Sequence, residues 1–127
     1  MRFLAAIFTV GMLSGPLFGN ANPNQSATTN SQAEKGLAAF YSRRMEGHKT
    51  ACGGVYHASE LTTAHRTLPC GTKVRITNTK NGKSLEATVN DRGPTSHKRL
   101  VDVSRAVAEQ LDFVRQGTTT VEVEVVK

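Results

Sequence analysis

Three stretches of the 127-residue chain alternate polar and apolar side chains with a period of two. Residues 72–77 and 84–89 flank residues 78–82, which end in an Asn-Gly pair, and residues 120–125 repeat the alternation near the C-terminus. Because successive side chains of a strand point to opposite faces, this period predicts strands with one buried face, and the Asn-Gly pair predicts a hairpin turn. Residues 36–41 are a further strand candidate. The side chains expected to face the core are Val74, Ile76, Leu85, Ala87, Val89, Val121, Val123 and Val125.

One segment, residues 105–111, has helical spacing instead. Val103, Val107 and Leu111 recur every four residues, and Ser104 stands where a helix N-cap is expected. The sequence therefore predicts a mostly β domain with one short α-helix near the C-terminus. Closure of the strands into a small barrel is expected, because it removes exposed sheet edges.

The first 21 residues have the features of a secretory signal peptide. Arg2 precedes an apolar run at residues 3–13, and small residues lead to a cleavage point expected after Ala21. The run is shorter than the roughly 20 residues of a membrane-spanning helix, so no transmembrane anchor is expected. No cysteine near the cleavage point offers a site for lipid attachment. Residues 22–35 are expected to form a flexible polar leader and residues 36–127 the folded domain, in a protein that is periplasmic or secreted.

The chain carries 16 Lys and Arg residues against 10 Asp and Glu, a net charge of +6. A basic chain suggests nucleic acid as a partner, but export directs the charge toward anionic polymers outside the cytoplasm. The alternative is that the charge keeps a small secreted protein soluble. The length accommodates one modest domain and excludes a two-domain enzyme with a separate cofactor-binding fold.

Cys52 and Cys70 are the two cysteines of the chain. In an exported protein such a pair most simply forms a disulfide. The alternative is a zinc site, because Cys52, His57, His65 and Cys70 follow one another at symmetrical spacings. The oxidising compartment favours the disulfide, and the spacing matches no common zinc module.

Two parts of the chain carry motifs more specific than a scaffold needs. The first part contains TACGGVY at residues 50–56 and LTTAHRTLPCGT at 61–72, and the second contains VNDRGP at 89–94 and RLVDVS at 99–104. With these motifs and spacings, residues 36–126 resemble the rare lipoprotein A family, whose pattern is approximately TA-x-GE-x-Y, TAAH-x-TLP-x-GT, V-x-NDRGP and R-x-IDLS. The resemblance implies a six-stranded double-psi β-barrel.

The resemblance also implies an activity on peptidoglycan. The family's relatives include endolytic lytic transglycosylases, which cleave MurNAc–GlcNAc bonds to give 1,6-anhydro products, and more distantly expansins. In the lytic members a carboxylic acid protonates the glycosidic oxygen, and the C6 hydroxyl of the sugar then attacks C1 without water. One acid–base group is then enough, in contrast to the paired carboxylates of ordinary glycosidases. The implied partner is the peptidoglycan glycan strand; no nucleic acid, cofactor or metal is expected, and a monomer is expected.

Carried over residue by residue, the resemblance places the family's catalytic Asp on Asp91, its catalytic His on His65 and a possible second carboxylate on Asp102. The family's Glu falls on Gly54, so a carboxylate is absent there, and Glu60 is the nearest acid in sequence. This departure favours the alternative that the chain is a non-catalytic, expansin-like module that binds glycan and loosens the wall.

Each of these residues also has a purely structural interpretation. Asp91 can cap a turn before Arg-Gly-Pro, His65 can be a buried histidine that donates to a backbone carbonyl, and Asp102 can stabilise the helix N-terminus. Tyrosines can stack on sugar rings or equally belong to the core. The candidate substrate-binding residues are Tyr41, Thr50, Tyr56, Asn90 and Arg92.

Overall fold

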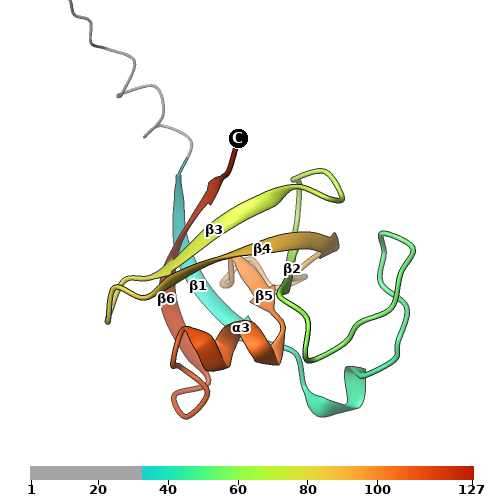
Figure 1. Cartoon of the computed structure of the whole chain (residues 1–127), viewed down its shortest axis with the longest axis horizontal. Coiled ribbons are helices and arrows are strands. Elements are labelled where there is room, and N and C mark those ends of the chain that lie inside the picture. Colours follow the sequence, from blue (N-terminus) through green and yellow to red (C-terminus); the bar gives the residue numbers. More distant parts are fainter. Residues whose placement is uncertain (1–32) are drawn as a thin grey trace, which may run out of the picture. The chain divides into compact units, whose positions relative to one another are not determined.

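The computed structural model describes residues 33–127. The predicted signal peptide and residues 22–32 of the predicted leader lie outside the described residues. In the described part, six strands and two short helices follow one another along the chain (Figure 1). They are β1 (Glu34–Phe40), the 3₁₀-helix η2 (Arg43–Met45), β2 (Thr62–His65), β3 (Lys73–Asn78), β4 (Ser84–Asp91), β5 (Val101–Val103), α3 (Arg105–Gln110) and β6 (Thr118–Val125).

The strands close into a barrel in the order β1-β5-β2-β4-β3-β6. Two neighbouring pairs, β1 with β5 and β2 with β4, are parallel, and the other four pairs are antiparallel. A closed six-stranded barrel with one short α-helix near its C-terminus confirms the predicted fold class. Because β2 and β4 are parallel neighbours, their C-terminal ends lie at the same edge of the barrel.

The predicted strands correspond to β3, β4, β6 and β1, and β3 and β4 form the predicted hairpin. β1 begins at Glu34, two residues before the expected start of the domain, so Glu34 and Lys35 belong to the barrel and not to the leader. β2 shows no alternation in the sequence because all four of its residues are buried, and a strand buried on both faces loses the period of two.

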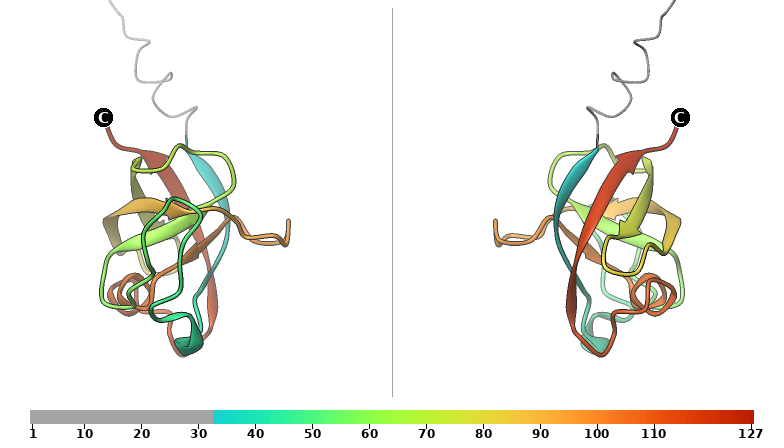
Figure 2. Two further views of the ribbon diagram at one scale, coloured as in Figure 1. Left: turned by 90° about the vertical axis from the view of Figure 1, so that its right-hand side faces the viewer. Right: turned by 90° about the vertical axis from the view of Figure 1, so that its left-hand side faces the viewer.

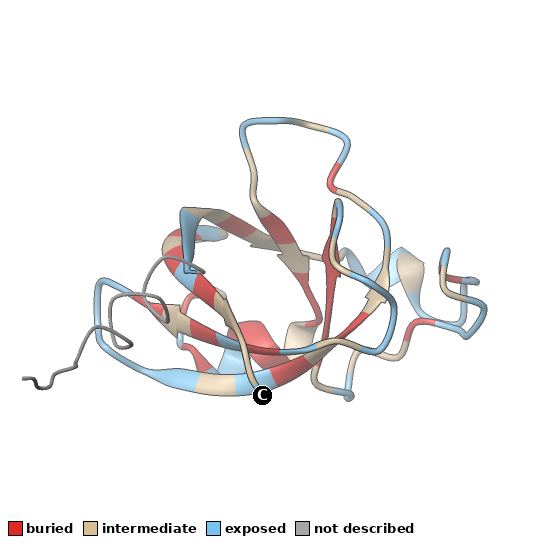
Figure 3. Ribbon diagram, turned by 90° about the horizontal axis from the view of Figure 1, so that it is seen from above, coloured by how far each residue is buried: buried red, intermediate tan, exposed pale blue. Residues whose placement is uncertain are grey.

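The inward faces of the strands and one face of α3 form a single hydrophobic core. Buried residues alternate with more exposed ones along β3, β4 and β6 (Figure 3). The predicted N-cap is confirmed, because Ser104 Oγ accepts a hydrogen bond from the Val107 amide at 3.3 Å. The helix buries Val107 and Ala108 and ends at Gln110, with Leu111 as its C-cap.

Two long connections leave the barrel, residues 41–61 between β1 and β2 and residues 92–100 between β4 and β5, the second of which projects from the barrel wall (Figure 2). Cys52 in the first connection is bonded to Cys70, with an S–S distance of 2.03 Å and a Cα–Cα distance of 5.8 Å. The predicted disulfide is confirmed, and the zinc alternative is wrong because both thiols are used.

Within residues 33–127, no cluster of three or more His, Cys, Asp or Glu side chains is arranged to hold a metal ion. The helices described here are also too short or too polar to cross a membrane.

Candidate active site

Asp91, the last residue of β4, faces outward because of a β-bulge. The pairing of β2 with β4 steps from Thr63 with Val89 to Ala64 with Asp91, so Asn90 is an extra residue in β4. Side chains alternate along a strand, so in a regular continuation of β4 without a bulge Asp91 would face the core as the buried Val89 does. A bulge re-aims the side chain that follows it, and here it places Asp91 on the outer face.

Asp102 lies on the same face, two strands away. Ala64 pairs with Asp91 of β4 on one side and with Asp102 of β5 on the other, and Ala39 of β1 pairs with Asp102. Asp102 points outward, since both of its neighbours in β5 are fully buried valines. With neighbouring strands roughly 4.8 Å apart, the two aspartate Cα atoms are about 10 Å apart. The structure therefore brings the two predicted carboxylates to the same face of the barrel, on either side of Ala64.

Three hydrogen-bond donors hold the Asp91 carboxylate. The Tyr41 hydroxyl donates to Oδ2 at 2.5 Å, and the backbone amides of Ala51 and Arg92 donate to Oδ1 at 2.8 and 2.9 Å. Hydrogen bonds to a carboxylate are short and directional, so they fix its orientation. The contact with Ala51 also ties the end of β4 to the connection between β1 and β2.

Tyr41 is supported from behind by Tyr56. The two rings stack with centroids 4.5 Å apart and planes inclined by 14°, and the Tyr56 hydroxyl accepts a hydrogen bond from the Arg105 amide at the start of α3. Burial, followed by the bond to Asp91, raises the pKa of Tyr41 far above its ordinary value, so its hydroxyl remains a donor. The negative charge of Asp102, on the same face of the barrel, adds to the same rise in the pKa of Tyr41.

His65 is directed away from Asp91. Its Nδ1 accepts hydrogen bonds from the amides of Thr67 and Leu68, both at 3.1 Å, so the proton belongs on Nε2, which lies 2.8 Å from a Glu34 carboxylate oxygen. Both ring nitrogens of the buried His65 are therefore occupied, and neither is bonded to Asp91. His65 is buried, as its structural interpretation expected, but its acceptor differs: the ring donates to the Glu34 carboxylate and not to a backbone carbonyl.

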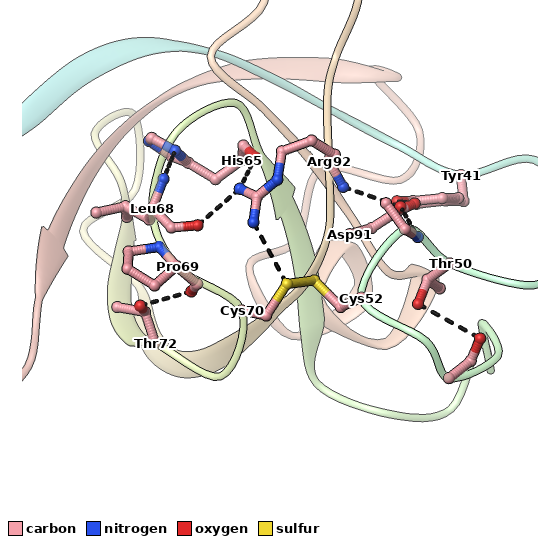
Figure 4. Close-up of a disulfide and its surroundings, with 12 residues drawn as sticks. Tyr41, Thr50, Cys52, His65, Leu68, Pro69, Cys70, Thr72, Asp91 and Arg92 are labelled. Atoms are coloured by element: carbon pink, nitrogen blue, oxygen red, sulfur yellow. Dashed lines mark hydrogen bonds between the residues drawn. A yellow bond between two sulfur atoms is a disulfide. The ribbon is translucent and has the colours of Figure 1, made fainter.

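The Arg92 guanidinium lies between His65 and the disulfide and does not bind Asp91 (Figure 4). Its Nη1 donates to the carbonyl oxygens of His65 at 2.8 Å and Leu68 at 2.6 Å, and its Nη2 lies 3.4 Å from Cys70 Sγ. Among the ion pairs within residues 33–127, none includes Asp91. Arg92 thus clamps the segment that follows β2, and the disulfide joins this segment to the connection that carries the Ala51 amide.

Asp102 has a cationic partner of its own. Its Oδ1 accepts a hydrogen bond from Arg99 Nε at 3.0 Å, and the two side chains remain partly exposed. The first three amides of α3 donate to the Tyr56 hydroxyl, the Ala58 carbonyl and Ser104 Oγ. The side chain of Asp102 is thus engaged by Arg99 on the barrel face, whereas other groups cap the helix.

Comparison with known proteins connects this arrangement to a family. A family model described as "Lytic transglycolase" matches residues 33–123. The chain belongs to this family. A relative within it, the endolytic peptidoglycan transglycosylase RlpA of Neisseria meningitidis serogroup A, is 50% identical over 91 residues. The match covers 72% of this chain but only 38% of that relative, so the chain spans well under half of the relative's length. The resemblance to the rare lipoprotein A family is confirmed.

Solved structures of the same fold are more distant in sequence. The Streptomyces papain inhibitor superposes with a TM-score of 0.62 at 23% identity, covering 76% of this chain and 96% of the inhibitor. A Clavibacter michiganensis expansin, a D78N mutant in complex with cellohexaose, superposes with a TM-score of 0.60 at 18% identity, covering 75% of this chain and 50% of the expansin. These likenesses concern the fold alone, and they confirm the predicted double-psi β-barrel.

Gly54, which stands where the pattern given above for the rare lipoprotein A family has Glu, has open space beside it. A Cβ built on Gly54 meets no heavy atom within 4 Å, so no other side chain, that of Glu60 included, lies against this position. The Gly54 carbonyl accepts hydrogen bonds from the Thr50 amide at 2.8 Å and from the Thr50 hydroxyl at 3.4 Å. Thr50 thus closes the loop through the Gly54 carbonyl, and a Cβ at position 54 fits without a clash.

Two of the predicted substrate-binding residues, Tyr56 and Thr50, are buried beneath the site. Tyr56 is 2% exposed and Thr50 is 7% exposed, so the prediction that they line a sugar-binding groove is corrected: Tyr56 packs under Tyr41, and Thr50 closes a loop. Asn90 is the bulge residue, and Arg92 holds backbone carbonyls while remaining exposed.

The sequence did not point to three contributors: Glu34, the Ala51 amide and Arg99. Glu34 was assigned to the leader, and a backbone donor such as the Ala51 amide has no side-chain signature. Arg99 stands three residues before Asp102, and this spacing within RLVDVS was the signal that could have identified the pair.

Proposed function

We propose that this chain is an endolytic peptidoglycan lytic transglycosylase that cleaves MurNAc–GlcNAc bonds to give 1,6-anhydro products, acting as a monomer outside the cytoplasm. One observation supports the proposal above the others: the bulge at Asn90 presents Asp91 on the outer face, held by three donors and without a cationic side chain bound to it. The relative from Neisseria meningitidis, named as an endolytic peptidoglycan transglycosylase, is half identical to this domain.

In this mechanism the protonated form of Asp91 reacts and gives its proton to the glycosidic oxygen as the bond from C1 to that oxygen breaks. The oxygen of the C6 hydroxyl then bonds to C1, and its proton passes to the Asp91 carboxylate. The group ends protonated, and no water is consumed. Between the two transfers, the donors from Tyr41, Ala51 and Arg92 stabilise the carboxylate without having to move.

Asp102 has a second role in the proposal. Its negative charge lies on the same face, about 10 Å from Asp91 between Cα atoms, where it favours the positive charge that develops at the sugar C1. His65 and Arg92 act as positioning residues, since their contacts hold the segment that follows β2 and not the substrate.

Digestion of purified sacculi followed by mass analysis tests the proposal. Asp91→Asn keeps the size of the side chain and removes the acid, so anhydromuramoyl products are expected to fall by a factor of about 10² to 10⁴. The matched control is Asp112→Asn, which makes the same change at an exposed position outside the site and tolerates the left-handed backbone there (φ 61°). Equal product release from Asp91→Asn and the original chain would refute the catalytic role.

The open space at Gly54 favours a second candidate, an expansin-like module that binds glycan without cleaving it. The fold is compatible with this candidate, because an expansin of the same fold was solved with cellohexaose. Binding to sacculi with no anhydro product at high protein load would select it.

Gly54→Glu separates the two candidates further. Nothing lies within 4 Å of the new Cβ, so the variant is expected to fold and, if a missing acid limits turnover, to release on the order of 100-fold more product. Gly54→Gln controls for size, and Val55→Glu places the same charge one residue away at an exposed position. A gain in all three variants would mean that the acid at position 54 is not the cause.

A further inference from the structure

A basic pocket lies beside β1, away from the Tyr41–Asp91 pair. Its volume is about 150 Å³, several times the space of one water molecule. Five of the eight lining residues have basic side chains and none is acidic. The basic ones are Lys35, Arg66, His97, Lys98 and Arg99.

Hydrogen bonds to backbone carbonyls hold the residues that line the pocket in place. Arg66 Nη1 donates to the carbonyl oxygens of Pro94, Ser96 and Arg99 at 3.0, 3.2 and 2.9 Å, which pins the projecting segment between β4 and β5. The Leu100 amide donates to the Leu37 carbonyl at 2.7 Å and joins that segment to β1. The backbone that carries the cationic side chains of residues 97–99 is therefore held in place by these hydrogen bonds.

Close approach of the two segments also requires a glycine at position 36. A Cβ on Gly36 would lie 2.8 Å from Leu100 Cβ, shorter than real contacts of this kind. Both carboxylates next to the pocket already have partners, because Glu34 binds His65 and Asp102 binds Arg99. Among the ion pairs in the part of the chain that the structure describes, none includes Lys35 or Lys98, so the charges of these two lining residues are left for an external anion.

The pocket is linked to the candidate active site through Arg99. Arg99 lines the pocket and also binds Asp102, and Asp102 shares the outer face of the barrel with Asp91. A polymer that passes over Asp91 and Asp102 can therefore reach the pocket with a neighbouring unit.

We propose that the pocket between Lys35 of β1 and residues 97–100 binds a carboxylate carried by the glycan strand. The inference rests on the proposed function for the identity of the polymer, and on the lining for the chemistry. Lys35 and Lys98 supply charge to the carboxylate as mobile ammonium groups, and the interaction weakens as salt rises because both are exposed.

Amide chemical shifts of the labelled protein test the pocket without any cleavage. Titration with N-acetylmuramic acid, which carries a lactyl carboxylate, is expected to shift the amides of residues 35–37 and 97–100 and to saturate. The carboxamide of the same sugar removes the charge and is expected to leave these amides unshifted. Equal shifts with the acid and the carboxamide, or shifts spread over the basic β3–β4 turn, would overturn the proposal.

A matched pair of substitutions separates the pocket from net charge. Lys98→Ala is expected to weaken binding of the acid by up to about five-fold, as for an exposed ion pair, and Lys35→Ala is expected to do the same. Lys83→Ala removes the same charge from an exposed residue of the β3–β4 turn and is expected to leave affinity unchanged. Equal weakening by Lys98→Ala and Lys83→Ala would refute a specific site.

Two further probes identify the source of the anion. N-acetylmuramoyl dipeptide, in which the lactyl group is an amide and the carboxylate belongs to the peptide, supports the carboxylate site if it shifts the same amides, and then assigns the stem peptide. Inorganic phosphate that binds more tightly than both sugars would overturn the assignment to a carboxylate. If sacculi yield no anhydro products while the acid still shifts these amides, the proposed function fails and the carboxylate pocket remains.

Discussion

The two halves of the barrel are built by different means. In the β3–β4–β6 half, six- and eight-residue strands alternate buried and exposed side chains, and Ile76 at the centre pairs with Leu85 and Val123. In the β1–β5–β2 half, β2 has four residues and β5 has three. The chain there leaves the barrel in long connections, tied down by a disulfide and by hydrogen bonds to charged groups.

This difference separates stability from chemistry. Burial of apolar side chains is non-directional and stabilises the first half without specifying where any polar atom points. The bulge interrupts the pairing of β2 with β4, where the two halves meet, and Tyr41 and Ala51 of the connection that follows β1 supply polar contacts that orient Asp91. Four substitutions test whether the division holds, and they are ordered here by the size of the expected effect.

The largest effect is expected from Ile76→Ala in the regular half. Ile76 is fully buried in the core, so truncation leaves a cavity and lowers the free energy of unfolding by about 2–5 kcal/mol. Denaturant unfolding measures this loss. Turnover on sacculi, assayed well below the unfolding midpoint, is expected to be unchanged because no contact of Asp91 involves β3. A loss of turnover in the folded variant would break the separation between the two halves.

The same division explains what the sequence revealed. Alternation and the Asn-Gly pair located β3, β4 and β6, because burial on one face leaves a period of two. Motif resemblance located Asp91 and Asp102, but the role of His65 was not readable from its place in TAAH. Its partner Glu34 is 31 residues away, and a hydrogen bond across that separation depends on the closed barrel. The extra residue Asn90 was hidden for a related reason, since a bulge is defined by the pairing with β2 and not by β4 alone.

The second effect concerns the disulfide of the irregular half. Replacing both Cys52 and Cys70 by Ser opens a crosslink that spans 18 residues, which is expected to lower the free energy of unfolding by about 3 kcal/mol. Unlike Ile76→Ala, this change is expected also to reduce turnover, because the Ala51 amide next to Cys52 is bonded to Asp91. Unfolding curves and product release from the same preparation measure both. A stability loss with unchanged turnover would mean that the loop holds its place without the crosslink.

The third effect is expected from Tyr41→Phe. This variant keeps the ring stacked on Tyr56 but removes the hydroxyl that donates to Asp91. A hydrogen bond to a charged group contributes about 1.5–3 kcal/mol, so kcat is expected to fall about ten-fold or more while KM stays unchanged. Tyr56→Phe is the matched control, because it removes the bond to the Arg105 amide and is expected to lower stability without lowering kcat. An increase in KM for Tyr41→Phe would indicate a contact with the sugar instead.

The smallest effect concerns an exposed pair in the connection between β1 and β2. A Glu46 carboxylate oxygen accepts a hydrogen bond from the Ala58 amide at 2.9 Å, and the other lies 2.8 Å from His57 Nδ1. The bond from Ala58, and then that from His57, lowers the pKa of Glu46 below its ordinary 4.5, and the bond to Glu46 raises the pKa of His57 above its ordinary 6.5. The stabilisation from Glu46 is therefore lost as pH falls through its lowered pKa, and that from His57 is lost as pH rises through its raised pKa.

The pair is consequently complete between about pH 4.5 and 6.5, and the connection that carries Ala51 is expected to be best ordered there. Hydrogen exchange at the Ala58 amide, corrected for its intrinsic rate, is expected to be slower at pH 6 than at pH 8. Glu46→Gln is expected to abolish this difference and to return the pKa of His57 toward 6.5 in an NMR titration. The control Glu109→Gln removes a carboxylate that binds Arg105 on α3 and leaves His57 unaffected. Glu46→Gln is expected to change the unfolding midpoint far less than the loss of the disulfide does. An equal change would mean that the Glu46–His57 pair, and not the disulfide, chiefly holds the connection between β1 and β2.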